Sequence, residues 1–447
     1  MSADDDTRLF AATDEELWTE NWDEPSPCPL TSIPGPQRDP WHRPQRGLLA
    51  YEVPLRSELS LSPASVIEEA LGLNPTSKKQ RCAAVGLLAN ALYGYSRSPD
   101  TFIFYSRDRN HYAKTRKRLR YFPTWYSRGN VLAAIEALED AGLIEHRRTK
   151  PSPTAKHRSR FAASERLVSI IEYASIEFVF EPSEIIVLRG ADGLPINYRE
   201  TDRTFKSRRD VKAHNEFLTN FDIGIDHPDA IEDARGFLRV GGCWLDTRRR
   251  SYRRIFNDRF CFGGRWYGTW WQNLPKKVRE AISINGENTV EVDYRACHLR
   301  LLYAHRGLAL PFKIHTTDPY EVPGFPRTLT KFAFNVMLNA KTKRKALGAI
   351  EKRLKVDGRF EVREHARALT NAVADHFHDL GQVWCTGMGM RLQNTDAEIC
   401  RRVQRQLRKA DVPALSVHDS FIVPASAQEL VNDVMEEEMS RACKGLS

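Results

Sequence analysis

The chain has 447 residues, of which 41% are hydrophobic and 28% charged, and 67 Lys+Arg against 58 Asp+Glu give a net charge of +9. That length predicts roughly two or three domains, and the composition excludes a largely disordered chain. No apolar run of about 18 residues occurs, and Met1–Asp6 is acidic where a secretory signal is basic. We therefore expect a soluble, cytoplasmic protein without a membrane partner, whose positive charge suits either an anionic partner or solubility alone.

Residues 1–60 are rich in Asp, Glu and Pro, and the prolines are too closely spaced for a helix to persist. We interpret this segment as a mobile tail. Trp18, Trp22 and Trp41 are unusual in a free tail, so an arm that packs on the body or on a partner is the alternative.

The segment that follows predicts a small helical domain with a basic loop. Ser127 is a suitable N-cap for a helix whose buried stripe is Val131, Ile135 and Leu138, and Gly142 supplies a left-handed exit. A short strand to Arg147, a basic loop and a return strand from Ser159 follow. This order resembles the end of a winged helix domain, and we assign residues 61–175 to it.

In the winged helix fold the recognition helix enters the major groove and the wing contacts the backbone or minor groove. Arg128 and Asn130 at the start of the helix are residue types that bond G and A edges. The DNA-binding candidates on this helix and wing are Arg128, Asn130, Arg147, Arg148, Lys150 and Arg158. A solvated basic surface, or a winged helix used for protein contacts, is the alternative.

Residues 176–285 are predicted to connect this domain to the next as a thumb-like region that contacts nucleic acid. Two short strands and a basic helix, Thr204–Asn220, occur there, although an exposed charged face is the commoner explanation of such a helix. An aromatic and glycine-rich turn around Arg265 leads towards the strand described next.

The last part of the chain contains two aspartates in distinctive settings. In Thr289–Tyr294, two valines alternate with Glu291 and Asp293, which predicts a strand with its carboxylates on one face. An aspartate at a strand end is also a common helix N-cap. Leu415–Pro424 reads as a hairpin with Asp419 at its tip.

Between the two aspartates, Pro326 precedes an amphipathic helix with polar residues four positions apart. Those residues are Arg327, Lys331, Asn335 and Asn339, and the apolar stripe is Leu329, Phe332 and Val336. The helix therefore offers two cations and two amides to one cleft.

The order of an acid on a strand, a helix with Arg and Lys one turn apart and a His-Asp hairpin is similar to motifs A, B and C of right-hand polymerases. The resemblance is to family A DNA polymerases and phage-type single-subunit RNA polymerases. Asp293-Tyr294 resembles motif A, Arg327 and Lys331 resemble motif B, and His418-Asp419-Ser420 resembles motif C. Gln393–Ala397 resembles the segment that reaches the template, and Arg265 loosely resembles an Arg-Gly-Arg segment before motif A.

The resemblance implies an α+β multidomain protein, with a winged helix domain followed by a compact palm and reduced fingers in residues 286–447. It implies two Mg²⁺ ions held by Asp293, Asp419 and the backbone carbonyl of Tyr294, which suits the preference of Mg²⁺ for oxygen ligands. Arg327 and Lys331 would act as catalytic cations on the triphosphate. The implied nucleotide-binding residues are Tyr294, His298, Arg327, Lys331, Asn335 and Asn339, and Gln393 and His418 would contact DNA.

Some positions depart from the family pattern. The aromatic residue of motif B is absent, with Asn335 and Asn339 at the plausible positions, and His298 stands where family A DNA polymerases carry Glu and the RNA polymerases carry Gly. Ser420 follows the RNA polymerase pattern. The preference for deoxyribonucleotides or ribonucleotides therefore stays open.

We expect a template-directed nucleotidyltransferase acting on DNA and nucleoside triphosphates, most simply a DNA polymerase that serves as replication initiator of a mobile element. One alternative is a sequence-specific DNA-binding regulator with a catalytically inactive palm. Another is a DNA-directed RNA polymerase or primase.

Overall fold

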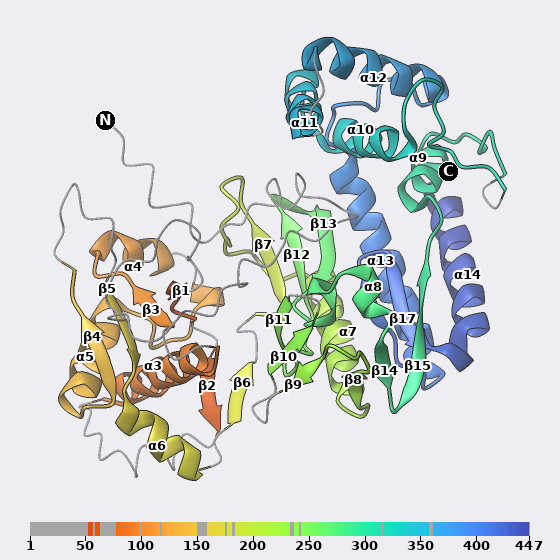
Figure 1. Ribbon diagram of the computed structural model, residues 1–447. Coiled ribbons are helices and arrows are strands. Elements are labelled where there is room, and N and C mark those ends of the chain that lie inside the picture. Colours follow the sequence, from red (N-terminus) through yellow and green to blue (C-terminus); the bar gives the residue numbers. More distant parts are fainter. Residues whose placement is uncertain are drawn as a thin grey trace.

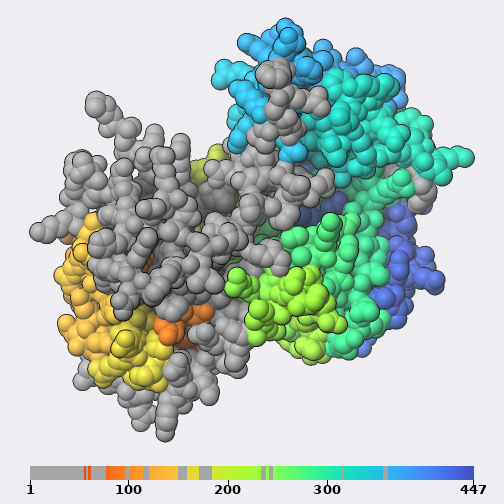
Figure 2. All heavy atoms as spheres, viewed as in Figure 1, coloured from red at the N-terminus to blue at the C-terminus, as the bar shows by residue number. Residues whose placement is uncertain are grey.

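The computed structural model in Figure 1 describes residues 52–56, 59–62, 77–97, 101–116, 119–149, 159–174, 177–180, 184–232, 237–240, 243–313, 316–356 and 361–446. These residues form a mixed α+β protein with more than one unit. An N-terminal unit, orange to yellow, lies at one side, a central part in yellow-green and green lies in the middle, and a C-terminal part in cyan and blue lies at the other side. The space-filling view in Figure 2 shows the cyan and blue helices projecting beyond the green central part.

The N-terminal unit places helices against one sheet. Its helices are α3 (Lys78–Arg97), α4 (Arg109–Arg116), η2 (Leu119–Tyr121), α5 (Arg128–Asp140) and α6 (Glu165–Ala174), and its strands are β1 (Glu52–Pro54), β3 (Phe102–Tyr105), β4 (Ile144–Arg147) and β5 (Ser159–Ala163). The sheet order is β1-β3-β5-β4, with β3 and β4 antiparallel to β5. α3 packs on α5, and the apolar faces of these helices form a core separate from that of the rest of the chain.

Helix α5 forms as its sequence predicts. The Ser127 hydroxyl accepts a hydrogen bond from the Asn130 backbone N–H, which satisfies one of the donors left open in the first turn. The predicted apolar stripe is buried, and burial of each such side chain contributes about 1.5–3 kcal/mol. Gly142 has φ +66°, the left-handed conformation that ends a helix.

The predicted mobile tail, residues 1–60, extends too far, because its last residues belong to paired strands. Most of residues 1–60 lie outside the described residues, but β1 pairs with β3, and β2 (Leu59–Ser62) pairs antiparallel with β6 (Glu177–Phe180). In β2 the apolar residues alternate with serines, and Leu59 and Leu61 are buried in the core of the N-terminal unit.

The central part contains two further sheets. Its elements are β7 (Ile186–Arg189), α7 (Asp202–Leu218), β8 (Ile223–Ile225), β9 (Ile231–Glu232), β10 (Phe237–Val240), β11 (Cys243–Asp246), β12 (Arg253–Asn257), β13 (Arg259–Tyr267), η3 (Trp271–Asn273) and α8 (Lys276–Arg279). The strand orders are β13-β12-β7 and β11-β10-β9.

The C-terminal part is built on a sheet of order β16-β17-β15-β14-β8. Its elements are β14 (Ile282–Ile284), β15 (Glu287–Asp293), α9 (Cys297–His305), α10 (Arg327–Asn339), α11 (Lys343–Val356), α12 (Val362–His376), η4 (His378–Leu380), α13 (Met388–Lys409), β16 (Leu415–Val417), β17 (Ser420–Pro424), η5 (Ala425–Ala427) and α14 (Gln428–Leu446). Helices α9, α13 and α14 pack together beside the sheet, whereas α10, α11 and α12 form a separate helical group (Figure 1).

The predicted domain boundary at residue 285 does not separate two cores. Trp266 and Trp271 of the central part belong to the same apolar cluster as Val292 and Phe421 of the C-terminal part. Strand β8 also pairs with β14, so the central part supplies a strand to the C-terminal sheet. Both parts therefore share one large core, beside which β7 and β12 form smaller apolar clusters.

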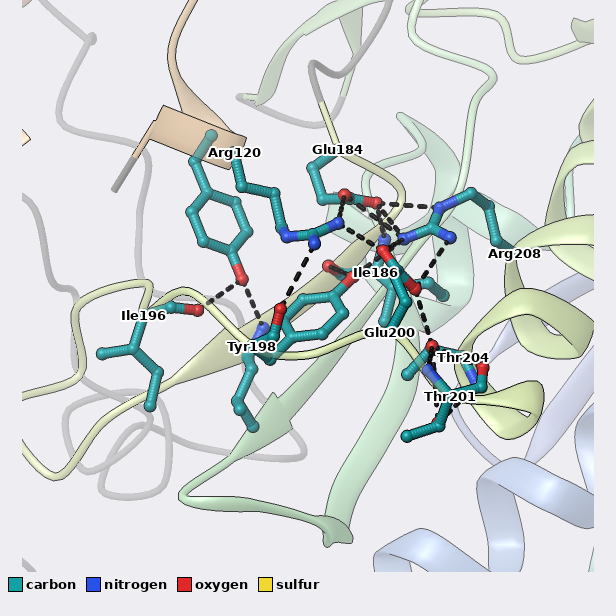
Figure 3. A network of polar contacts seen from close by, with 11 residues as sticks. Arg120, Glu184, Ile186, Ile196, Tyr198, Glu200, Thr201, Thr204 and Arg208 are labelled. Carbon is teal, nitrogen blue, oxygen red and sulfur yellow. Dashed lines mark hydrogen bonds and ion pairs between the residues drawn. The ribbon is translucent and has the colours of Figure 1, made fainter. Parts of the chain in front are cut away.

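An ionic network joins the N-terminal unit to the central part. Figure 3 shows Arg120 of η2 and Arg208 of α7 facing two carboxylates, Glu184 and Glu200. Arg120 bonds Glu184 at 3.0 Å and also pairs with Glu200, while Arg208 bonds Glu184 at 3.1 Å and Glu200 at 2.9 Å. The guanidinium of Arg120 lies 4.1 Å from the ring centre of Tyr198.

The electrostatics of this network favour its ionised form. Burial opposes ionisation of Glu200, but bonds from Arg208, Thr204 and Arg120 lower its pKa to about 2. Nearby, the Tyr121 hydroxyl donates to the Ile196 carbonyl at 2.8 Å and accepts from the Leu188 backbone N–H. The connection between the units thus combines ion pairs with main-chain hydrogen bonds.

Among the helices that the structure describes, none has the length and apolar composition needed to cross a bilayer.

We predict that Arg208→Gln lowers the free energy of unfolding by about 2–4 kcal/mol, because Glu184 and Glu200 keep only one of their two cations in a partly desolvated position. The measurement is urea denaturation followed by circular dichroism. Lys212→Gln on the same helix is the matched control: Lys212 is exposed and 3.9 Å from Glu216, so its loss should cost less than about 0.5 kcal/mol.

The double variant Arg208→Gln, Glu200→Gln removes one charge of each sign and should recover at least half of that loss. If Arg208→Gln costs no more than the control, the network does not contribute to stability.

Candidate active site

The pairing of β15 with β17 brings the two predicted aspartates together. The strands are antiparallel, with Val292 opposite Phe421 and Asp293 opposite Ser420. Asp419 directly precedes Ser420, so both carboxylates lie at the same end of this strand pair. Strands β16 and β17 are buried, and the two residues between them, His418 and Asp419, form the predicted tight hairpin turn.

The turn conformation is unusual for the residues that form it. His418 has φ +61°, in the left-handed region that a residue with a side chain adopts at a cost of about 1–3 kcal/mol. Its ring packs edge-on against Tyr267 of β13, with 5.6 Å between ring centres. The buried strands and this contact hold the strained turn that carries Asp419.

The two carboxylates, which we call the acidic pair, interact electrostatically. Loss of hydration and then the charge of Asp419 raise the pKa of Asp293 to about 7, with a smaller effect from Glu291. Lys276 and Lys331 act in the opposite direction. The side chain of Asp293 keeps access to solvent. An acidic pair with like charges and solvent access is an arrangement that a divalent cation relieves.

Glu291, on the same strand, has a structural role. Arg279 bonds both of its carboxylate oxygens, at 3.0 and 2.9 Å, and the Ser420 hydroxyl donates to one of them at 2.7 Å. These bonds outweigh the effect of burial and lower the pKa of Glu291. The bond from Ser420 also ties β15 to β17 beside the acidic pair.

The acidic pair is the donor set that this site offers to metal ions. Within the part of the chain that the structure describes, no group of three or more His, Cys, Asp or Glu side chains is placed to hold a metal ion. Two carboxylates suit Mg²⁺, which keeps several waters and takes further oxygens from substrate phosphates. Tyr294, whose backbone carbonyl is the third predicted ligand, directly follows Asp293 in the sequence. The Tyr294 hydroxyl donates a hydrogen bond to the Met435 carbonyl at 2.7 Å.

The predicted cations lie on α10, which begins after Pro326 as expected. Lys331 is exposed and close enough to Asp293 to lower the pKa of that carboxyl. Arg327 is exposed as well, but it is ion-paired with Asp318. The structure therefore directs the charge of Lys331 towards the acidic pair, while Arg327 has an acidic partner in the preceding segment.

Two of the predicted substrate contacts point elsewhere. Asn339 faces the first turn of α13, where even a Cβ on Gly389 would lie 2.0 Å from its Oδ1, and its Nδ2 donates to the Asn335 carbonyl. Gln393 is 2% exposed, and its Nε2 has no hydrogen-bond partner among the described residues. Helix packing therefore buries the side chain of Gln393, whereas Asn339 is partly exposed but has its Oδ1 buried against α13.

The buried face of α10 also differs from the predicted stripe. Leu329 is buried as expected, but Phe332 and Val336 are partly exposed. Ala333, Phe334, Met337 and Leu338 form the rest of the buried face. The helix is rotated because its apolar face packs on α12 and α13.

His298 lies on α9 in a contact that sequence reasoning missed. Its Nε2 is 2.7 Å from Oδ2 of Asp396 on α13, and the same carboxylate receives Arg265 of β13 at 2.6 Å. We call these three residues the buried triad. Each member lies in a segment that the motif comparison includes, but the sequence does not predict their contact, because they are far apart in the chain.

The predicted DNA-binding side chains of the N-terminal unit are partly engaged within the protein. Arg128 Nε donates to the Arg107 carbonyl at 2.9 Å, and Asn130 Nδ2 donates to the Trp125 carbonyl at 3.0 Å. Arg147 and Arg148 are exposed on and after β4. Lys150 and Arg158 lie outside the described residues.

Comparison with known proteins gives no assignment. No model of a known protein family matches the chain, and no curated protein matches it in sequence.

We predict that Asp293→Asn stabilises the metal-free protein at pH 8. The pKa of Asp293 is raised from 3.8 in the unfolded chain to about 7 in the folded protein, so the folded state binds the proton more tightly between these values. The favourable contribution of the protonated carboxyl is complete below about pH 4 and is lost as the pH rises through 7.

Thermal unfolding in EDTA should give a higher midpoint for Asp293→Asn than for the wild type at pH 8, and the difference should narrow as the pH falls to 4. Glu280→Gln, an exposed position, should shift the midpoint little at either pH. A pH-independent difference for Asp293→Asn would show that repulsion within the acidic pair is not its cause.

Proposed function

We propose that this protein is a template-directed nucleotidyltransferase, most simply a DNA polymerase with a compact palm and reduced fingers. The observation that carries the proposal is the β15–β17 register, which places Asp293 next to the hairpin that presents Asp419. The order of elements also agrees with the motif order, since α10 with Lys331 lies between these strands in sequence and acts electrostatically on Asp293.

Two Mg²⁺ ions held by Asp293, Asp419 and the backbone carbonyl of Tyr294 would stabilise the attacking and leaving oxygens of an in-line displacement. The protein's own groups supply position and charge. Lys331 is placed to bind triphosphate oxygens, and Arg327 is placed to do so if it exchanges its Asp318 partner for phosphate. Glu291 and Arg279 keep the strand end rigid, so that the two carboxylates hold their positions.

The N-terminal unit supports a DNA-binding role. The element order α3, β3, α4, α5, β4, β5 resembles that of a winged helix domain, and β3, β5 and β4 are neighbours in a sheet that also contains β1. In that arrangement α5 would be the recognition helix, and Arg147 and Arg148, at the end of β4 and directly after it, would begin the wing. The partner we propose is duplex DNA at this unit, with primer and template at the acidic pair.

A second function, a DNA-binding regulator with an inactive palm, is favoured by two observations. At positions where the family contacts template and nucleotide, Gln393 is buried and Asn339 packs against Gly389 of α13. Primer extension with Mg²⁺, comparing dNTPs with NTPs, separates the two functions. Site-specific binding without incorporation on any template would support the regulator.

We predict that Asp419→Asn abolishes incorporation and leaves the Kd for duplex DNA within about twofold, because the carboxylate serves the metals while the duplex binds the N-terminal unit. Primer extension and a gel-shift titration on the same preparations measure both quantities. Asp411→Asn, at an exposed position before β16, is the control and should retain both activities. Equal loss of incorporation and duplex binding would show that the active site is misplaced.

We predict that His298→Gly lowers the ratio of kcat/KM for dNTP to that for NTP by about tenfold, the scale of discrimination set by one steric contact. A ring at this place in motif A restricts the space for a 2′-hydroxyl. His305→Gly, at the exposed end of the same helix, is the control and should leave the ratio unchanged. An unchanged ratio in His298→Gly would mean that the ring does not face the sugar.

A further inference from the structure

In the buried triad, Arg265 and Asp396 form an ion pair in which two guanidinium nitrogens bond the carboxylate. Arg265 Nε lies 3.2 and 3.1 Å from the two oxygens of Asp396, and one terminal nitrogen lies 2.6 Å from Oδ2. The same terminal nitrogen is 3.2 Å from Nε2 of His298. The side chains of Arg265 and Asp396 are only 5% and 2% exposed.

The buried triad adjoins the acidic pair. Arg265 and Tyr267 lie two positions apart on β13 and therefore on the same face, and the ring of Tyr267 contacts His418 in the turn that holds Asp419. His298 lies on α9, which follows Asp293 after a short turn. Burial alone would lower the pKa of Arg265, but Asp396 and then Asp419 raise it above its ordinary value.

The guanidinium of Arg265 thus has two carboxylates within electrostatic reach, Asp396 and Asp419. In a desolvated setting an Arg–carboxylate bond is strong, and Arg265 cannot lose its charge. While Asp396 bonds it through two nitrogens, Asp419 stays available to other cations. Without the charge of Asp396, Asp419 is a carboxylate whose charge still acts on this buried cation.

We propose that Asp396 is a positioning residue that holds the guanidinium of Arg265 away from Asp419 and so keeps the acidic pair available to divalent cations. This inference rests on the proposed function for its purpose, but it concerns cation binding and is tested without nucleotide or DNA. It assigns a role to a residue that the motif comparison includes only as part of the segment Gln393–Ala397.

The test is Mn²⁺ binding to the full chain, measured by electron paramagnetic resonance of the free ion. Asp419→Asn provides the reference that subtracts binding at other acidic sites. Asp396→Asn has nearly the same shape but no charge, and we expect it to raise the Kd of the acidic pair for Mn²⁺ by about tenfold, because Arg265 then competes for Asp419.

Two further variants separate competition from structural damage. Asp396→Glu restores the charge and should bind Mn²⁺ within about threefold of the wild type. The double variant Asp396→Asn, Arg265→Gln lacks the competing cation as well. Its Kd for Mn²⁺ should return to within about threefold of the wild-type value. Thermal unfolding shows which variants are folded, and the neutral double variant also avoids an unpaired buried charge.

The matched control is Asp210→Asn. Asp210 is a buried carboxylate that bonds Arg401 of α13 at 2.5 Å, and its loss should leave Mn²⁺ affinity within about twofold. Wild-type affinity in Asp396→Asn would overturn the proposal. An equal loss of Mn²⁺ affinity in Asp396→Asn and in the double variant would also overturn the proposal, because the loss would then not depend on the charge of Arg265.

Primer extension on the same proteins distinguishes this proposal from the proposed function. Mn²⁺ binding that follows the expected order, without any incorporation by the wild type, would contradict the polymerase and leave the role of Asp396 standing. Incorporation by the wild type together with unchanged Mn²⁺ affinity in Asp396→Asn would support the polymerase and contradict the role of Asp396.

Discussion

The antiparallel register of β15 and β17 is the constraint on which the candidate site depends. A shift of one residue would turn the side chains of β15 to the opposite face and move Asp293 away from the hairpin. The register is fixed by apolar burial, because Phe421, Ile422 and Val423 are almost completely inaccessible. The Ser420 hydroxyl adds a polar bond to Glu291 at the same place. The position of the acidic pair is therefore a consequence of core packing and of the turn at His418.

The acidic pair also differs from the other carboxylates in its surroundings. Buried or half-buried acids elsewhere in this part of the molecule bond arginines, and the pairs are Arg279–Glu291, Arg265–Asp396, Arg254–Glu398 and Arg402–Glu438. Asp293 has no ion-pair partner among the described residues, and loss of hydration together with the charge of a second carboxylate raises its pKa. Two neighbouring carboxylates without such partners lower the stability of the folded protein through the repulsion of their charges. An arrangement of this kind is typical of functional sites.

The sequence predicted the elements of this site better than it predicted their contacts. The strand with Asp293, the helix that starts at Arg327 and the hairpin with Asp419 are confirmed, because alternation, helical periodicity and turn residues are local signals. The burial of Gln393, the packing of Asn339 on α13 and the buried triad were not predicted. Each depends on which helix covers which face, and a single sequence does not contain that information. The strands at residues 52–54 and 59–62 were missed because the prolines before them dominated the local pattern.

Helix α13 connects the parts of the site that the sequence separates. Its first turn contacts α10 through Gly389 and Asn339, Asp396 binds Arg265 of β13, and Arg401 binds Asp210 of α7. Backbone hydrogen bonds from Cys385 and Gly387, just before the helix, to the end of α10 add to this connection. Gly387 has φ +74°, so the junction uses a backbone conformation that most residues avoid. The packing of this one helix therefore brings α10, which carries Lys331, and Asp396 of the buried triad into the same part of the molecule.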